Sequence, residues 1–165
     1  MKEQVIEKKP IPNKELRHFI KSFSRGKRIK QNDITYYKIL KDKLLISTAV
    51  RHGVTNQLFD EIKANSPFDD KQWSTFLYLN IRTLQRYKIA KDHVFKPLLS
   101  EKIFELAEVI ALGNIVFDSP DDFRIWLLTP SIALGKEKPI NLLDNSYGME
   151  LVIAELNRIE YGVFV

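Results

Sequence analysis

The stretch DKQWSTFLYLNIRTLQRYK, residues 70–88, decides how the fold is interpreted. It holds two short groups of apolar residues at helical spacing, and Asn80, which lies between the groups, is a good N-cap for a second helix. We therefore expect a helix, a tight turn and a second helix that ends near Lys88. The side chains that these two helices are expected to bury are Trp73, Phe76, Leu77, Ile81 and Leu84.

Polar side chains occupy the other side of the second helix. At roughly 100° per residue, Arg82, Thr83 and Arg86 project away from the buried side, and Gln85 lies at the border. Residues 81–90 carry a net charge of +3. Such a helix suits the major groove of DNA, because arginine can bond guanine, glutamine can bond adenine, and threonine or the helix N-terminus can hold a phosphate.

The second helix is therefore a candidate recognition helix, and the alternative interpretation is a basic helix that only faces solvent. Its reading face is small, so a monomer would bind weakly and a homodimer is expected. The candidate DNA-binding residues are Asn80, Arg82, Thr83, Gln85, Arg86 and Lys88.

Helical spacing of apolar residues recurs along most of the chain, and proline and glycine mark the ends of the segments. Ser119 followed by Pro120 is typical of a helix N-terminus. Alternating strands rich in β-branched residues are absent, so we predict an all-α fold. The other expected helical segments are one from about 37 to 52, one around 58–62, one from about 98 to 117, one at 120–128, a short turn at 140–143 and a last helix at 146–161.

Positive charge is concentrated at the beginning of the chain. The net charge is +7 over residues 1–30, +4 over residues 31–100 and −6 over residues 101–165. A basic front and an acidic back suggest two surfaces with different partners, one of them a polyanion. Residues 1–35, with the helix-resisting run KKPIP at 8–12, are expected to be a basic, flexible segment, either solvated or an arm that holds phosphate or a partner.

The sequence carries no recognisable catalytic constellation. Its three histidines, His18, His52 and His93, are scattered without a second ligand at metal-binding spacing, and cysteine is absent. The six glycines are isolated, so no glycine-rich phosphate loop is present. Two pairs of carboxylates, at 69–70 and 121–122, stand where helix N-termini favour negative charge, and we interpret them as caps. We expect a binding protein without enzyme activity, cofactor or metal.

Length and composition narrow the class of protein. The chain of 165 residues is 44% apolar and 28% charged, which is ordinary for a globular protein. Its longest uncharged stretch, residues 125–135, is shorter than the roughly 20 residues that cross a bilayer. The first residues have no apolar signal-peptide region, and the absence of cysteine fits a reducing compartment. We therefore expect a cytoplasmic location.

The sequence also resembles a known family. Residues 73–87, WSTFLYLNIRTLQRY, look like the Xre-type helix-turn-helix of bacterial Xre/MbcA/ParS antitoxins. Further along the chain, several motifs in the same order are similar to that family's toxin-binding domain, and the resemblance covers about residues 40–165. These motifs are Trp126-Leu127-x-Thr129-Pro130, Ala133-Leu134-Gly135, Pro139-x-x-Leu142-Leu143, Tyr147-Gly148 and the ending from Leu156 to Phe164.

The resemblance implies an antitoxin of a type II toxin–antitoxin pair. Relatives bind RES-type toxins that consume NAD⁺, obstruct the toxin's active site and repress their own operon. We therefore expect an Xre-like helix-turn-helix domain at 36–117, followed by a small helical toxin-binding module at 118–165. Two positions depart from the family's pattern: Asn80 stands where relatives often have Ser, which also caps helices, and Ser131 stands where they often have Asn.

The last third of the chain is acidic but rich in large apolar groups, some of which must form the module's own core. Trp126 belongs either to that core or to an interface, and Arg158 can approach a toxin or pair with a neighbouring glutamate. The loop around Leu134 and the apolar chain end are expected to contact the partner. The candidate toxin-binding residues are Trp126, Leu134, Gly135, Arg158, Tyr161, Val163 and Phe164.

The leading interpretation is a cytoplasmic antitoxin that sterically neutralises a RES-type, NAD⁺-degrading toxin. It would also bind its own operator DNA as a homodimer within the toxin–antitoxin complex. The alternative is a stand-alone helix-turn-helix regulator whose carboxy-terminal module only dimerises. A small hydrolase is disfavoured by the missing catalytic constellation.

Overall fold

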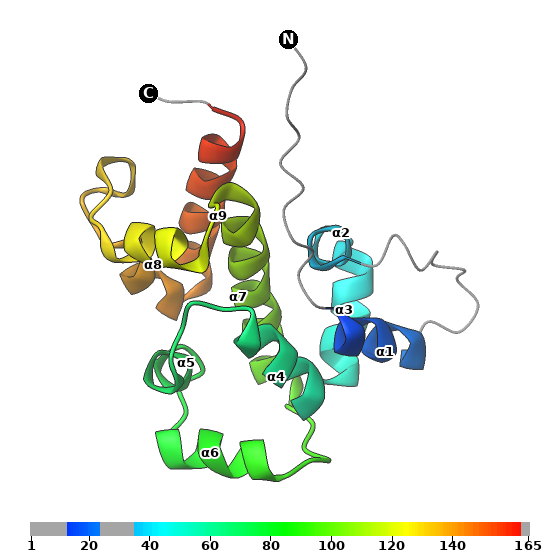
Figure 1. Ribbon diagram of the computed structural model, residues 1–165. Helices are drawn as coiled ribbons and strands as arrows, with labels where there is room; N and C mark the ends of the chain where they lie inside the picture. The colour runs from blue at the N-terminus through cyan, green and yellow to red at the C-terminus, as the bar shows by residue number, and fades with distance from the viewer. Residues whose placement is uncertain (1–12, 24–34, 163–165) are drawn as a thin grey trace.

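The computed structural model describes residues 13–23 and 35–162, and this part of the chain is helical throughout (Figure 1). Its only extended pairing is an isolated antiparallel bridge between Thr55 and Val94, so the predicted all-α class is confirmed. The elements are α1 (Lys14–Phe23), α2 (Tyr36–Lys41), α3 (Lys43–His52), α4 (Asn56–Ala64), α5 (Asp70–Phe76), α6 (Ile81–Ile89), α7 (Pro97–Val116), α8 (Pro120–Leu128), the 3₁₀ turns η2 (Ile132–Leu134) and η3 (Pro139–Asp144), and α9 (Ser146–Glu160).

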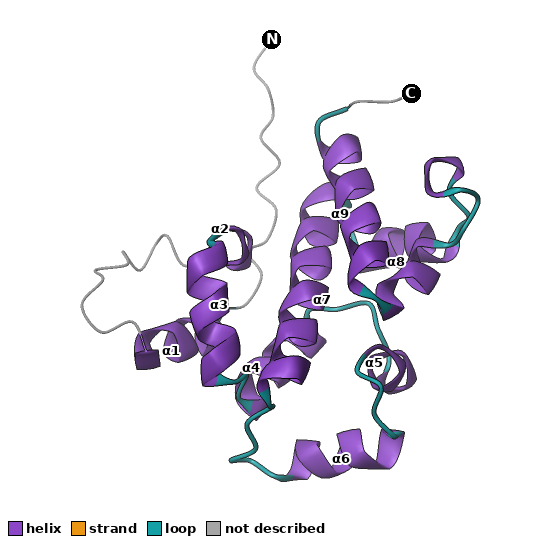
Figure 2. Ribbon diagram, turned by 180° about the vertical axis from the view of Figure 1, so that it is seen from behind, coloured by secondary structure: helices purple, strands orange, loops and turns teal. Residues whose placement is uncertain are grey.

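The 20-residue helix α7 is the centre of the fold. It packs against α2 and α3 on one side and against α8 and α9 on the other, and Figure 2 shows it lying between α3 and α9. Its buried residues occur all around the helix, because helices cover it from several directions. The amino-terminal helices and the carboxy-terminal module therefore share one core.

Three of the helix starts that the sequence predicts are made by the expected caps. Asp69 and Gln72 form a capping box at α5, with Gln72 N–H donating to Asp69 Oδ1 at 2.8 Å and Asp69 N–H donating to Gln72 Oε1 at 2.9 Å. At α6, Asn80 Oδ1 accepts the N–H of Arg82 at 2.8 Å. At α8, Ser119 Oγ accepts the N–H of Asp122 at 3.1 Å. The prediction of these helix starts is confirmed.

The single helix expected from about 37 to 52 is wrong, because the chain breaks at Asp42 into α2 and α3. The Asp42 side chain accepts the N–H of Leu45 at 3.0 Å and so caps α3. A short carboxylate side chain that bonds the backbone in this way competes with helix continuation. Leu44 consequently points to solvent.

Residues 14–23 form the helix α1, which corrects the expectation of an irregular segment through residue 35. Its buried side chains, Leu16, Phe19 and Ile20, follow helical spacing and pack toward α3 and α4. The Glu61 carboxylate accepts the N–H groups of Glu15 at 2.7 Å and Leu16 at 3.1 Å. An anion at a helix N-terminus is stabilising, so α1 is capped from α4, far along the chain. Residues 1–12 and 24–34 lie outside the described residues.

Candidate functional site

The turn between α5 and α6 places α6 at one edge of the molecule, at the bottom of Figure 1. Trp73, Phe76 and Leu84 are buried as predicted and hold the two helices against the core. Ile81 departs from the prediction, since 39% of its surface is exposed. It is the first residue of α6, where the helix leaves the core, so little of the core covers its side chain.

The candidate DNA-binding residues are brought together on the outer face of α6. Thr83 is half-buried, and the other five candidates are exposed. Three of these, Arg82, Arg86 and Lys88, are cations spread over two turns of one short helix. The carboxy-terminal end of α6 is also basic, which complements the negative end of the helix dipole. This face offers both cations for phosphates and an amide for base edges.

The carboxy-terminal end of α6 is fixed by an aromatic contact. The ring of Tyr87 stacks on His93 with 3.7 Å between centroids, and His93 meets Phe95 edge-on at 4.8 Å. Burial, and secondarily the nearby positive charge of Arg86, lowers the pKa of His93 below its usual value. Lowering the pKa favours the neutral ring, which packs at the carboxy-terminal end of α6.

In the carboxy-terminal module, an aromatic cluster joins α8 to α7. The Phe123 ring stacks on Phe117 at 5.6 Å, and Trp126 lies 5.6 Å from Phe117. The ring of Phe123 lies against Gly113 of α7, where any side chain on the glycine would collide with it. Trp126 is half-buried in this cluster, so most of its surface serves the module's own core.

The loop between α8 and η3 is closed on itself. Ser131 N–H donates to the carbonyl of Glu137 at 3.0 Å, and Lys136 N–H donates to the carbonyl of Ser131 at 2.7 Å. Leu134 is only 9% exposed and anchors the loop from inside, whereas Gly135 is exposed. Gly135 and Lys136 both have positive φ, at 70° and 68°. A lysine in this conformation is held by its surroundings, which makes the loop a rigid protrusion.

The remaining candidates for toxin contact lie on α9 or beyond it. Arg158 donates to Glu155 at 2.9 Å, which is the neighbouring-glutamate alternative considered from the sequence. Tyr161 is exposed at the carboxy-terminal end of α9. Val163 and Phe164 lie outside the described residues. The candidates from Trp126 to Tyr161 are therefore not gathered into one exposed patch.

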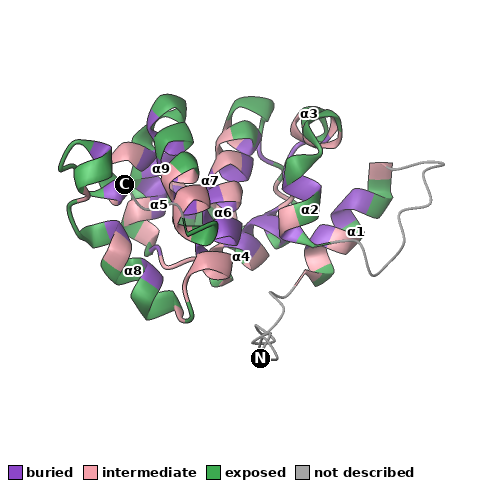
Figure 3. Ribbon diagram, turned by 90° about the horizontal axis from the view of Figure 1, so that it is seen from above, coloured by how far each residue is buried: buried purple, intermediate pink, exposed green. Residues whose placement is uncertain are grey.

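The structure exposes a set of apolar side chains that sequence reasoning missed. Ile125, Leu128 and Ile132 are 64%, 42% and 87% exposed, and we call them the apolar ridge. Ile125 and Leu128 lie on the side of α8 opposite Phe123 and Leu127, which are fully buried. In Figure 3, most residues of α8 are coloured as exposed, with buried and intermediate positions between them. The sequence did contain a signal for these exposed side chains, because α8 has apolar residues on both sides of the helix and only one side can face the core.

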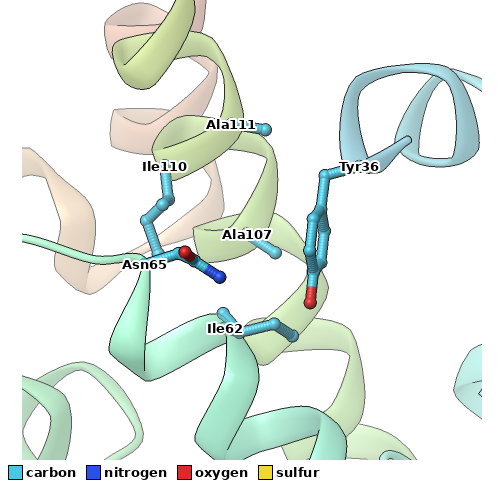
Figure 4. Close-up of a pocket in the computed structure, with 6 residues that line it drawn as sticks. All are labelled: Tyr36, Ile62, Asn65, Ala107, Ile110 and Ala111. Atoms are coloured by element: carbon cyan, nitrogen blue, oxygen red, sulfur yellow. The ribbon is translucent and has the colours of Figure 1, made fainter. Parts of the chain in front are cut away.

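The pocket between α2, α4 and α7 is too small for an organic ligand. Its volume is about 10 Å³, room for about one water molecule. Figure 4 shows the side chains of Tyr36, Ile62 and Asn65 around it, with the small side chains of α7 on the other side. Within residues 13–23 and 35–162, no three His, Asp or Glu side chains are grouped to hold a metal ion. In the same ranges, no helix is long and apolar enough to span a membrane.

Comparisons with known proteins match both halves of the chain. Residues 46–108 match the antitoxin Xre-like helix-turn-helix domain, and residues 112–162 match the antitoxin Xre/MbcA/ParS C-terminal toxin-binding domain. The chain is also 29% identical over 124 residues to the Prs ADP-ribosylating antitoxin of Sphingobium sp. (strain YBL2). That alignment covers 70% of this chain and 77% of the relative. The α6 face lies in the first matched range and the apolar ridge in the second.

Proposed function

Since the chain belongs to the Xre/MbcA/ParS family of antitoxins, we propose that it binds and neutralises a toxin through the apolar ridge and its rigid loop. One observation carries this proposal: three large apolar side chains stand in solvent inside the range that matches a toxin-binding domain. Apolar anchors of this kind supply most of the binding energy of protein interfaces. A partner that covers the ridge removes that surface from water.

We infer that the toxin is a RES-type enzyme that consumes NAD⁺ and that the antitoxin blocks its substrate cleft without performing catalysis. The relative's name, which refers to ADP-ribosylation, supports this inference, because ADP-ribosyl groups are drawn from NAD⁺. The exposed residues Gly135 and Lys136, in a loop closed by backbone hydrogen bonds, are available for contact with the toxin. Such a toxin acts on cytoplasmic NAD⁺, so the proposal includes a cytoplasmic location.

The experiment is to purify the chain with the protein encoded beside it and to measure NAD⁺ loss. We expect the neighbouring protein alone to consume NAD⁺ and the complex to be inactive. If the neighbour binds but has no such activity, the toxin class is wrong. If the protein encoded beside the chain does not bind it, the antitoxin function is wrong. The alternative function, a DNA-binding regulator, would then remain.

We also propose that the exposed face of α6 binds operator DNA and represses the antitoxin's own operon. The three cations of this face and the amide of Gln85 support this role, since cations hold phosphates and an amide can pair with adenine. The short reading face suits a homodimer on two half-sites about one helical turn apart, or a multiple of it. Fluorescence anisotropy with the duplex upstream of the gene tests this. Binding no tighter than to a scrambled duplex would contradict it.

A further inference from the structure

Tyr78 is an unusual residue at the turn between α5 and α6. Its φ of 51° lies in the left-handed region, which side-chain-bearing residues rarely adopt. The side chain is 74% exposed, so core packing does not hold it. The turn precedes Asn80, the N-cap of the recognition helix, and sets the direction in which α6 leaves α5. A Schellman motif at the end of α5 holds this conformation: the N–H of Tyr78 donates to the carbonyl of Thr75 at 3.1 Å, and the N–H of Leu79 donates to the carbonyl of Ser74 at 2.9 Å.

The side chain of Tyr78 makes a further contact, which reaches the toxin-binding module. The Tyr78 hydroxyl donates a hydrogen bond to the backbone carbonyl of Asp144, the last residue of η3. Lys102 Nζ of α7 donates to the same carbonyl at 3.1 Å, and its ammonium lies 5.9 Å from the centre of the Tyr78 ring. We call Tyr78, Lys102 and the Asp144 carbonyl the clasp. It joins residues 66 positions apart, one from each matched domain.

The clasp borders an open groove. The groove has a volume of about 400 Å³ and is lined among others by Leu79, Leu98 and Ser146. Packed side chains therefore do not fill this side of the junction. Elsewhere η3 packs against α5, α8 and α9. A continuous set of contacts thus runs from α8, which carries the apolar ridge, through η3 and the clasp to the turn before α6.

We propose that Tyr78 is a positioning residue that couples the toxin-binding module to the recognition helix. Movement of η3 shifts the Asp144 carbonyl, the clasp transmits the shift to the side chain of Tyr78, and the turn before α6 changes the direction of that helix. A toxin seated on the ridge presses on α8, which rests on η3, and so alters the affinity for DNA. This coupling rests on the proposed function of the two surfaces. The link from η3 through the clasp to α6, however, is present in the free chain.

Hydrogen–deuterium exchange on the free, full chain tests the coupling without toxin or DNA. Asn145→Ala removes the N-cap of α9 directly after Asp144, where Asn145 Oδ1 accepts the N–H of Gly148 at 3.0 Å. With Tyr78 present, we expect this change to raise exchange in residues 81–89 about threefold. In a Tyr78→Phe background, which lacks only the hydroxyl, the same change should leave exchange in α6 within about 1.5-fold.

The matched control is Tyr147→Phe, which removes the hydroxyl of another exposed tyrosine at the start of α9. In that background the response of α6 should stay intact. Thermal melting of each variant checks folding, and Asn145→Gly, which removes the capping side chain at a smaller cost in stability, replaces Asn145→Ala if the latter lowers Tm out of range. An equal rise of α6 exchange with and without the Tyr78 hydroxyl, or no rise in either, overturns the coupling.

A second measurement separates this inference from the proposed function. With the duplex upstream of the gene as the probe, Tyr78→Phe should weaken binding about threefold to tenfold, and Tyr147→Phe should not change it. If the unaltered chain does not bind the duplex, the DNA-binding proposal fails, and the exchange experiment alone decides the coupling. If it binds and Tyr78→Phe binds equally well, the clasp does not position α6.

Discussion

The two exposed surfaces of this chain are built from opposite chemistry. On α6 the exposed side chains include three cations and the amide of Gln85, beside the apolar Ile81 and Ile89. On α8 and η2 they include the apolar ridge, beside the charged Asp121, Asp122 and Arg124, in a region whose net charge is negative. Both surfaces lie on short helices that a buried face fixes to the shared core. The fold is thus a common support for both surfaces.

This difference predicts different physical behaviour. Phosphate contacts release counterions, so binding through α6 should weaken steeply with salt. Burial of the apolar ridge should depend little on salt, because the hydrophobic effect does not require charge. Binding of DNA and binding of the toxin should therefore respond differently both to substitutions and to the salt concentration.

The largest effect is expected on the apolar ridge. Changing Ile125→Lys together with Ile132→Lys replaces its two most exposed side chains with cations, and folding is little affected because neither residue is in the core. Loss of two anchors should weaken toxin binding about 100-fold or more, with DNA affinity within about twofold. Biolayer interferometry with the toxin measures the change. Leu44→Lys, an equally large change at an exposed leucine of α3, is the control and should bind normally.

The second prediction concerns Arg82 and Arg86. The double change Arg82→Ala/Arg86→Ala should weaken operator binding about 10- to 100-fold and make the slope of log K against log salt shallower by up to about 2. Arg124→Ala, an exposed cation of α8, serves as the control and should leave the slope unchanged. Unaltered affinity of the double variant would show that α6 does not contact DNA.

The third prediction tests the support beneath the ridge. Any side chain at Gly148 would collide with the backbone carbonyl of Leu142, because α9 and η3 are in close contact there. Gly148→Ala should therefore lower the free energy of unfolding by about 1–2 kcal/mol, even though alanine favours helix. Urea denaturation measures the loss. Glu150→Ala, at an exposed position of the same helix α9, should cost less, and equal costs would contradict the packing argument.

The smallest effect is expected from pH at His93, beneath α6. Burial and Arg86 lower its folded-state pKa, so the unfolded chain binds the proton more readily. Stability contributed by the neutral ring is therefore present above about pH 6.5 and is lost as the pH falls toward the folded-state pKa. Urea midpoints at pH 7 and pH 5 should differ less for His93→Gln than for the natural chain. If the urea midpoints of both chains shift equally between pH 7 and pH 5, His93 does not contribute to the pH dependence of stability.

The sequence was sufficient where structure is determined locally. Asp69, Asn80 and Ser119 cap helices through hydrogen bonds to residues two or three positions away, and such patterns are visible in a short window. The polar face of α6 followed from its period, although Ile81 is less buried than its spacing suggested. The breaking of the expected first helix at Asp42 shows that one side-chain cap can override a continuous apolar period.

The parts that the sequence did not reveal depend on distant partners. Helix α1 is capped by Glu61, some 45 residues away, so its start carried no local signal. Leu134 and Ile132 are equally apolar and nearly adjacent, yet one is buried and the other exposed, because only the folded loop decides which one faces the core. The bond from Tyr78 to the Asp144 carbonyl involves a backbone atom, which no pattern of residue types can indicate.

The most direct test of two separate surfaces is growth of bacteria that co-express the toxin with each variant. At equal antitoxin levels, we expect the natural chain and Arg82→Ala/Arg86→Ala to restore growth. We expect Ile125→Lys/Ile132→Lys not to restore it. Deleting the whole carboxy-terminal module would be a poorer test, because α9 covers the buried face of α7. Full rescue by Ile125→Lys/Ile132→Lys would contradict the account, since the apolar ridge would then play no part in neutralising the toxin.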